Sequence, residues 1–119
     1  MSDLPIMQPI HFVEDIESAN DFERKHTPHI DITRIEGKTH VTIDLGYYVE
    51  HPNEPGHYFD FIELLVNGVP VAHFHGAAGL VDPHVELILN LDAGNLVTAL
   101  ASCNLHGVWQ SELMVQPEY

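Results

Sequence analysis

The dipeptide Asn67-Gly68 lies between two apolar runs, residues 58–66 and 69–75. Asn-Gly is the strongest short signal for a two-residue β-hairpin turn, because both residues tolerate the left-handed backbone that this turn needs. The segment Asp92-Ala93-Gly94-Asn95 separates two further apolar runs and also predicts a turn of hairpin type. Antiparallel hairpins are therefore expected to make up much of the fold.

Alternation of apolar and polar residues extends this prediction to other parts of the chain. In residues 39–45, Val41, Ile43 and Leu45 would face a core while Thr42 and Asp44 face solvent. The expected strands span residues 29–35, 39–45, 58–66, 69–75, 84–91, 96–102 and 108–115. Short strands with a turn about every 8–12 residues are typical of an all-β sandwich or barrel.

The N-terminal part of the chain lacks this alternation. Residues 1–10 contain two prolines and are expected to form an irregular arm, and residues 13–24 could form one or two helical turns. Pro28 would end any helix before it. We therefore expect one domain of 119 residues, with an arm in residues 1–28 and a sandwich in residues 29–119.

The charge of the chain is strongly negative. Eighteen acidic residues face four basic ones, a net charge of −14, and all four basic residues precede residue 39. Such a surface repels nucleic acid and anionic lipid, so no partner of either kind is expected. No apolar run approaches the about 18 residues of a membrane span, and no secretory signal is visible. With a single cysteine and no internal disulfide, a cytoplasmic protein is expected.

Ten histidines and one cysteine are the candidate functional residues. Four histidines and the cysteine lie beside turn residues, where a β scaffold places ligands: His26, His51, His57, Cys103 and His106. Taken alone, Cys103 could be a nucleophile, a metal ligand or an inert buried thiol. Four imidazoles and one thiolate exceed the four ligands of a closed zinc site, and suit a redox-active iron with an open position better.

The remaining histidines are expected to be ordinary solvated or hydrogen-bonded side chains, with one exception. His73 and His75 lie at i and i+2 of an expected strand, share one face, and could form a surface metal site. Trp109 is expected in the core or behind the functional site.

Three segments resemble the iron-site motifs of the superoxide reductases, the neelaredoxin and desulfoferrodoxin family. They are Lys25-His26-Thr27-Pro28, the loop from His51 to Tyr58, and the segment from Cys103 to Trp109. The resemblance spans roughly residues 23–115 and is to the short, single-iron form. It implies a seven-stranded immunoglobulin-like β-sandwich whose arm carries the first iron-site loop.

The resemblance also implies the metal centre. Non-heme iron, cycling between Fe2+ and Fe3+, would have four equatorial imidazoles and the axial thiolate of Cys103. Lys25 would lie beside the open face where superoxide binds. In the family a glutamate directly precedes the lysine and caps the oxidised iron, whereas here Arg24 holds that position. Glu23 would reach the iron only if the loop is longer by one residue; otherwise the ferric ion is five-coordinate or takes water or an anion.

The implied activity is one-electron reduction of superoxide to hydrogen peroxide, a detoxification, with a rubredoxin-like donor restoring the ferrous state. Relatives of this form are often homo-oligomers, so a tetramer or dimer is an expectation from the resemblance. Two alternatives remain open at this point. One is an iron domain of the same fold that transfers electrons or binds a partner without catalysis. The other is a zinc- or nickel-loaded sandwich with a structural role.

Overall fold

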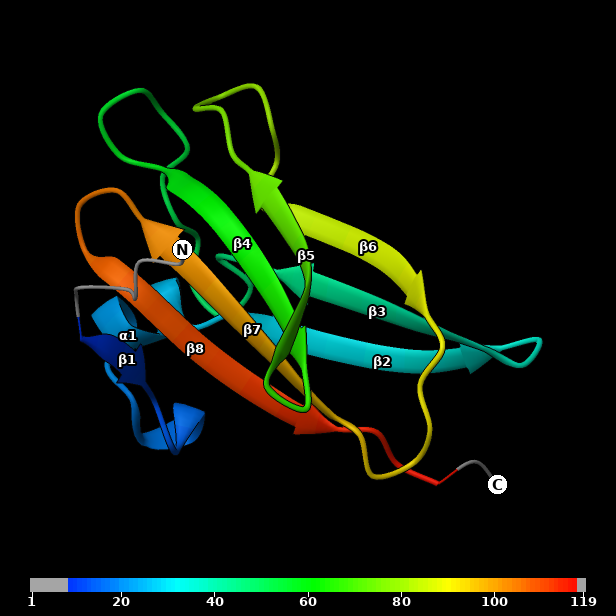
Figure 1. Ribbon diagram of the computed structural model, residues 1–119. Helices are drawn as coiled ribbons and strands as arrows, with labels where there is room; N and C mark the ends of the chain where they lie inside the picture. Colours follow the sequence, from blue (N-terminus) through cyan, green and yellow to red (C-terminus); the bar gives the residue numbers. More distant parts are fainter. Residues whose placement is uncertain (1–8, 118–119) are drawn as a thin grey trace.

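The computed structural model describes residues 9–117 and is a two-sheet β-sandwich (Figure 1). One sheet has five strands in the order β1-β8-β7-β4-β5, and the other has three in the order β2-β3-β6. The strands are β1 (Ile10–Phe12), β2 (His29–Ile35), β3 (Lys38–Asp44), β4 (Phe59–Val66), β5 (Val69–His75), β6 (His84–Leu89), β7 (Leu96–Cys103) and β8 (Gly107–Met114). None of the helices in the described part of the chain is long and apolar enough to span a membrane.

The prediction of an all-β sandwich is confirmed, and each of the seven expected strands is present with small shifts at its ends. β2 and β3 form a hairpin, β3 pairs with β6, and β4 pairs with both β5 and β7. Strands β2 to β8 thus follow the immunoglobulin-like pattern, in which a hairpin and a third strand face a second sheet. All pairings among these seven strands are antiparallel.

The core lies between the two sheets. Val41 and Ile43 of β3 and Leu64 of β4 are fully buried, while Thr42 and Asp44 are partly exposed, as the alternation predicts. The same cluster of buried residues includes Phe59 and Cys103, at the start of β4 and the end of β7. The core therefore reaches one end of the sandwich, and the functional residues lie there.

The two predicted hairpin turns have different outcomes. Asn67 and Gly68 have positive φ angles of 50° and 81° and join β4 to β5 as expected. The segment Asp92–Asn95 is a turn, with the Asn95 amide donating to the Asp92 carbonyl at 3.1 Å. The hairpin prediction there is wrong, because β6 lies in the three-stranded sheet and β7 in the five-stranded sheet. Turn residues indicate that the chain reverses its direction, but they do not indicate which sheet the next strand joins.

The N-terminal part is more ordered than predicted. Residues 1–8 of the expected arm lie outside the described residues, but Ile10–Phe12 forms β1, an eighth strand that runs parallel to β8. The expected helical turns are a 3₁₀ helix at Ile16–Ser18 and the helix α1 at Asp21–His26. α1 ends at His26, and its C-cap Thr27 is extended because a residue preceding proline, here Pro28, disfavours helical geometry.

Candidate metal centre

Three segments that are distant in sequence meet at one end of the sandwich (Figure 1). α1 ends at His26, the loop between β3 and β4 carries His51 and His57, and Cys103 is the last residue of β7. His106 lies in the tight connection to β8, where Gly107 adopts a φ of 84° that favours glycine. The fold thus brings all five predicted ligands to this end.

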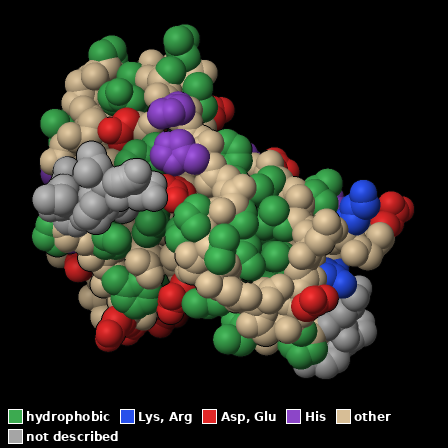
Figure 2. All heavy atoms as spheres, in the orientation of Figure 1, with side chains coloured by type: hydrophobic (Ala, Val, Ile, Leu, Met, Phe, Trp, Pro, Cys, Tyr) green, Lys and Arg blue, Asp and Glu red, His purple; other side chains and the backbone are tan. Residues whose placement is uncertain are grey.

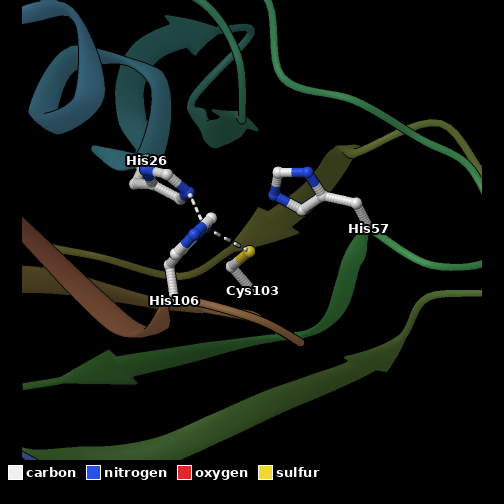
Figure 3. Close-up of side chains that lie close together, drawn as sticks. All are labelled: His26, His57, Cys103 and His106. Carbon is white, nitrogen blue, oxygen red and sulfur yellow. Dashed lines mark hydrogen bonds between the residues drawn. The ribbon is translucent and has the colours of Figure 1, made fainter.

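The tightest group contains four of the five. The ligand atoms of His26, His57, Cys103 and His106 all lie within 4.8 Å of one another (Figure 3). Nδ1 of His106 is 3.7 Å from Sγ of Cys103 and 3.2 Å from Nε2 of His26. His51 is outside this group, but its ring lies next to those of His26 and His57.

The four imidazole rings lie around a rough square. Successive ring centroids are 4.9 Å apart for His26 and His51, 4.7 Å for His51 and His57, 5.1 Å for His57 and His106, and 4.9 Å for His106 and His26. The distance across the square, from His26 to His57, is longer at 6.5 Å. Four imidazoles arranged in this way could face one ion.

Backbone carbonyls hold two of the rings in one orientation. Nδ1 of His26 donates to the Phe22 carbonyl and Nδ1 of His51 to the Pro52 carbonyl, both at 2.7 Å. In each ring the other nitrogen, Nε2, is therefore unprotonated and free to bind a metal. Such carbonyl contacts are the usual support for metal-bound histidines.

Two ring nitrogens at this end of the sandwich, Nε2 of His51 and Nε2 of His57, are buried and lack a hydrogen-bond partner among the described residues. A buried polar atom without a partner costs free energy, and an ion at the centre of the ring square would satisfy both. His57 is held by a tight turn in which its amide and carbonyl both bond to Glu54, at 2.9 and 3.0 Å.

The environment keeps the imidazoles of His26, His51 and His57 neutral. Burial lowers the pKa of His26 and of His51 to about 4, against contributions from the carbonyl contacts that raise it. Burial also lowers the pKa of His57. A metal needs the deprotonated imidazole, so at neutral pH three of the rings are ready to bind without releasing a proton.

The donor set fits a borderline transition-metal ion. Several imidazole nitrogens with one thiolate suit iron, zinc, nickel or copper, and exclude magnesium or calcium, which take oxygen ligands. His26 and Cys103 are 1% and 2% exposed, so the centre is screened from water on the side of the core.

The three residues before His26 have separate surroundings. The Glu23 carboxylate accepts from the Asn20 amide at 3.1 Å while the Glu23 amide donates to the Asn20 side chain at 2.8 Å, a capping box at the start of α1. Arg24 donates to the carbonyls of Ile16 and Glu17, at 2.9 and 2.5 Å. Neither side chain is in the metal-binding group.

Lys25 is the cation next to the centre. Its positive charge helps to lower the pKa of His26, His51 and His57, after the larger effect of burial in each case. Lys25 is thus the basic residue whose charge acts on these three rings.

Two supporting residues complete the site. Asn104, which sequence reasoning missed, accepts from the Tyr58 amide at 2.8 Å and donates to the Gly56 carbonyl at 3.1 Å. It therefore ties the loop that carries His57 to the connection that carries His106. The only available signal was the preference of asparagine for turns. Trp109, expected behind the site, stacks on His26.

The comparisons with known proteins agree with this geometry. The sequence model of a family described as Desulfoferrodoxin matches residues 18–112. A putative superoxide reductase from Methanocaldococcus jannaschii is 29% identical over 105 residues, covering 84% of this chain and 90% of that protein.

Solved structures give the same relationship. The superoxide reductase from Nanoarchaeum equitans is 26% identical with a TM-score of 0.75, covering 90% of this chain and 100% of that one. The superoxide reductase (neelaredoxin) from Ignicoccus hospitalis is 26% identical with a TM-score of 0.75, covering 92% and 95%. Because the family model matches about four fifths of its length, the chain belongs to the desulfoferrodoxin family, the family of the superoxide reductases and neelaredoxins.

Proposed function

We propose that this protein is a superoxide reductase with one non-heme iron. The observation that carries the proposal is the square of four imidazoles beside a buried thiolate, with two buried Nε2 atoms that lack partners. Nε2 of His26, His51 and His57, Nδ1 of His106 and Sγ of Cys103 would hold the ion. When bound, the iron supplies the single electron that, with two protons, converts superoxide to hydrogen peroxide.

Cys103 would supply the thiolate ligand. Its thiol is buried at the end of β7, and it is held by pairing with Phe59 of β4 on one side and Gly107 of β8 on the other. This double pairing fixes the backbone of Cys103 and so limits the positions that its sulfur can take. A thiolate is an electron-rich ligand, so it would favour electron donation from the bound iron to the substrate.

Lys25 would attract the substrate and orient it. Superoxide is an anion, and a chain with a net charge of −14 repels it at long range. The positive charge of Lys25, which acts on three of the rings, would provide the local field and the N–H donors for this anion.

The oxidised iron is expected to be five-coordinate, or to bind water or an anion, without the Glu23 carboxylate. Glu23, the candidate carboxylate ligand, is engaged with the Asn20 amide at the start of α1, and Arg24 is engaged with the 3₁₀ helix. For the carboxylate to reach the ion, the capping box would have to open. A rubredoxin-like donor, a cytoplasmic location and a homo-oligomeric assembly remain predictions from the resemblance.

Metal analysis, visible spectroscopy and pulse radiolysis on one preparation test the proposal. The purified protein should contain one iron per chain, show a thiolate-to-ferric charge-transfer band when oxidised, and react rapidly with superoxide when reduced. Replacement of Cys103 by Ser should remove the band and the reaction. Zinc in place of iron would indicate a structural site. An iron protein that reduces superoxide slowly would indicate the electron-transfer or partner-binding alternative.

A further inference from the structure

We propose that the five-stranded sheet carries a second metal site, formed by His73, His75 and Glu63 on its outer face. We call these three residues the β5 site. Its ligand would be a divalent ion of the borderline transition metals, with Cu2+ bound most tightly. The inference does not depend on the activity proposed above.

The backbone places both histidines on the same exposed face. β5 is the edge strand of its sheet, and His73 and His75 alternate with Ala72 and Phe74, which pack against the core. Side chains two residues apart on a strand point the same way. The two imidazoles therefore project from the sheet into solvent. In Figure 2, histidine side chains gather over the C-terminal end of β5.

The rings already have the spacing of neighbouring metal ligands. The ring centroids of His73 and His75 are 5.0 Å apart, with an interplanar angle of 72°. Neighbouring rings in the metal centre are 4.7–5.1 Å apart, with angles of 71–79°. The β5 pair thus reproduces one side of the imidazole square without being part of it.

Glu63 supplies a third ligand from the next strand. It lies directly opposite His73 in the register of β4 and β5, and its Oε2 is 3.4 Å from Nδ1 of His73. Phe61 stacks on the His73 ring with centroids 5.1 Å apart, which limits the positions of that imidazole. One histidine is therefore held in place between a carboxylate and an aromatic ring.

The β5 site is looser than the metal centre. Within residues 9–117, only the group at the metal centre has every ligand atom within 4.8 Å of the others. The side chains of His73 and Glu63 are 43% and 25% exposed, so small rotations can close the β5 site around an ion. Such rotations involve no core residue.

The ligands select the class of ion. Two imidazole nitrogens and one carboxylate oxygen suit Cu2+, Ni2+ and Zn2+, while Mg2+ and Ca2+ prefer oxygen ligands alone. Among the divalent first-row ions, Cu2+ binds such a site most tightly. The net charge of −14 also raises the concentration of cations near the surface.

Copper titration of the oxidised, iron-loaded protein tests the proposal, because iron then fills the metal centre and does not reduce Cu2+. Electron paramagnetic resonance should show one bound Cu2+ per chain with hyperfine coupling to two nitrogens, and iron content should be unchanged. The substitutions His73→Ala and His75→Ala should each weaken Cu2+ binding about tenfold or more. Glu63→Gln should weaken it less. His40→Ala, which removes a strand histidine from the other sheet, is the matched control and should change nothing.

Three results would overturn the proposal. They are Cu2+ binding that survives both His73→Ala and His75→Ala, binding that is lost in His40→Ala, and release of iron in step with copper uptake. Circular dichroism of each variant checks that the sandwich is intact. Because no result depends on superoxide chemistry, failure of this site and failure of the proposed activity are distinguishable.

Discussion

The indole ring of Trp109 stacks on the imidazole of His26, with centroids 5.0 Å apart and an interplanar angle of 19°. The same indole donates its N–H to the carbonyl of His106 at 3.1 Å. One residue of β8 therefore supports two proposed ligands that come from opposite ends of the chain. Phe22, from the first turn of α1, makes ring contacts with His26, His106 and Trp109 and closes this aromatic group.

The substitution Trp109→Phe should loosen the metal centre more than the fold. Phenylalanine keeps an aromatic face against His26 but loses the hydrogen bond to His106, a loss of about 1 kcal/mol, with further cost from the smaller ring. We expect iron to dissociate faster and the charge-transfer band to shift. Chelator-induced iron release measures the rate. Asn95→Ala, which removes a hydrogen bond of 2.8 Å to Asp92 at the opposite end of β7, should lower stability without changing iron release.

The substitution Asn104→Ala should separate the two ligand-bearing segments. It removes two hydrogen bonds and leaves the Tyr58 amide without its partner, at a cost of about 1–3 kcal/mol. Since His57 lies on the loop that these bonds hold, iron affinity should fall along with the free energy of unfolding. Equilibrium competition with a chelator measures the affinity. An unchanged affinity would show that the tight turn at Glu54 holds His57 by itself.

The metal-free protein should lose stability in mild acid. Burial lowers the pKa of His26 and His51 to about 4, from an ordinary value of 6.5. The unfolded chain therefore binds more protons than the folded one between these values, so stability falls as pH drops from 6.5 toward 4. Urea unfolding at pH 7 and pH 5 measures the loss. The loss of stability should be smaller in His26→Gln. An equal loss in that variant would show that protonation of His26 does not contribute to it.

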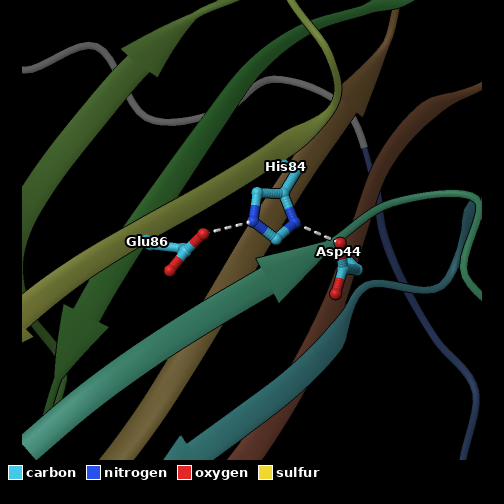
Figure 4. Close-up of polar contacts among 3 residues, drawn as sticks. All are labelled: Asp44, His84 and Glu86. Carbon is cyan, nitrogen blue, oxygen red and sulfur yellow. Dashed lines mark hydrogen bonds and ion pairs between the residues drawn. The ribbon is translucent and has the colours of Figure 1, made fainter.

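His84 should show the opposite pH dependence. It lies between the carboxylates of Asp44 and Glu86, which raise its pKa, the contact with Asp44 having the larger effect (Figure 4). Its contribution to stability is complete below pH 6.5 and is lost as pH rises through the raised pKa. The side chain is 41% exposed, so the contribution should be under about 1 kcal/mol. Titration by NMR should show a lower His84 pKa in Asp44→Asn than in Glu86→Gln.

The sequence predicts most of the fold because the signal is local. Strands such as β3 alternate strictly, and Asn67-Gly68 specifies its hairpin by backbone conformation alone. β1 is only three residues long and pairs with β8 across the whole chain, so no local pattern reveals it. The same limit applies to the turn at Asp92–Asn95, whose flanking strands separate into different sheets.

The functional site, like the fold, could be predicted from the sequence only in part. Histidines beside turn residues could be recognised as candidate ligands, since loops at strand ends carry such groups. The partners of Glu23 and Arg24 could not, because a glutamate three residues after Asn20 fits a capping box as well as a metal ligand. Only the packing of α1 against the 3₁₀ helix, through the contacts of Arg24 with Ile16 and Glu17, distinguishes these cases.

Lys25 provides the sharpest test of how an acidic protein receives an anionic substrate. If its ammonium supplies the local positive field, Lys25→Ala should slow the reaction of the ferrous protein with superoxide by about tenfold and flatten the dependence of that rate on ionic strength. Lys38→Ala is the matched control, since Lys38 begins β3 at the hairpin with β2, away from the metal centre. It removes the same charge and should alter the rate little. Equal rates and salt slopes in both variants would mean that the net charge, and no single lysine, governs the approach of superoxide.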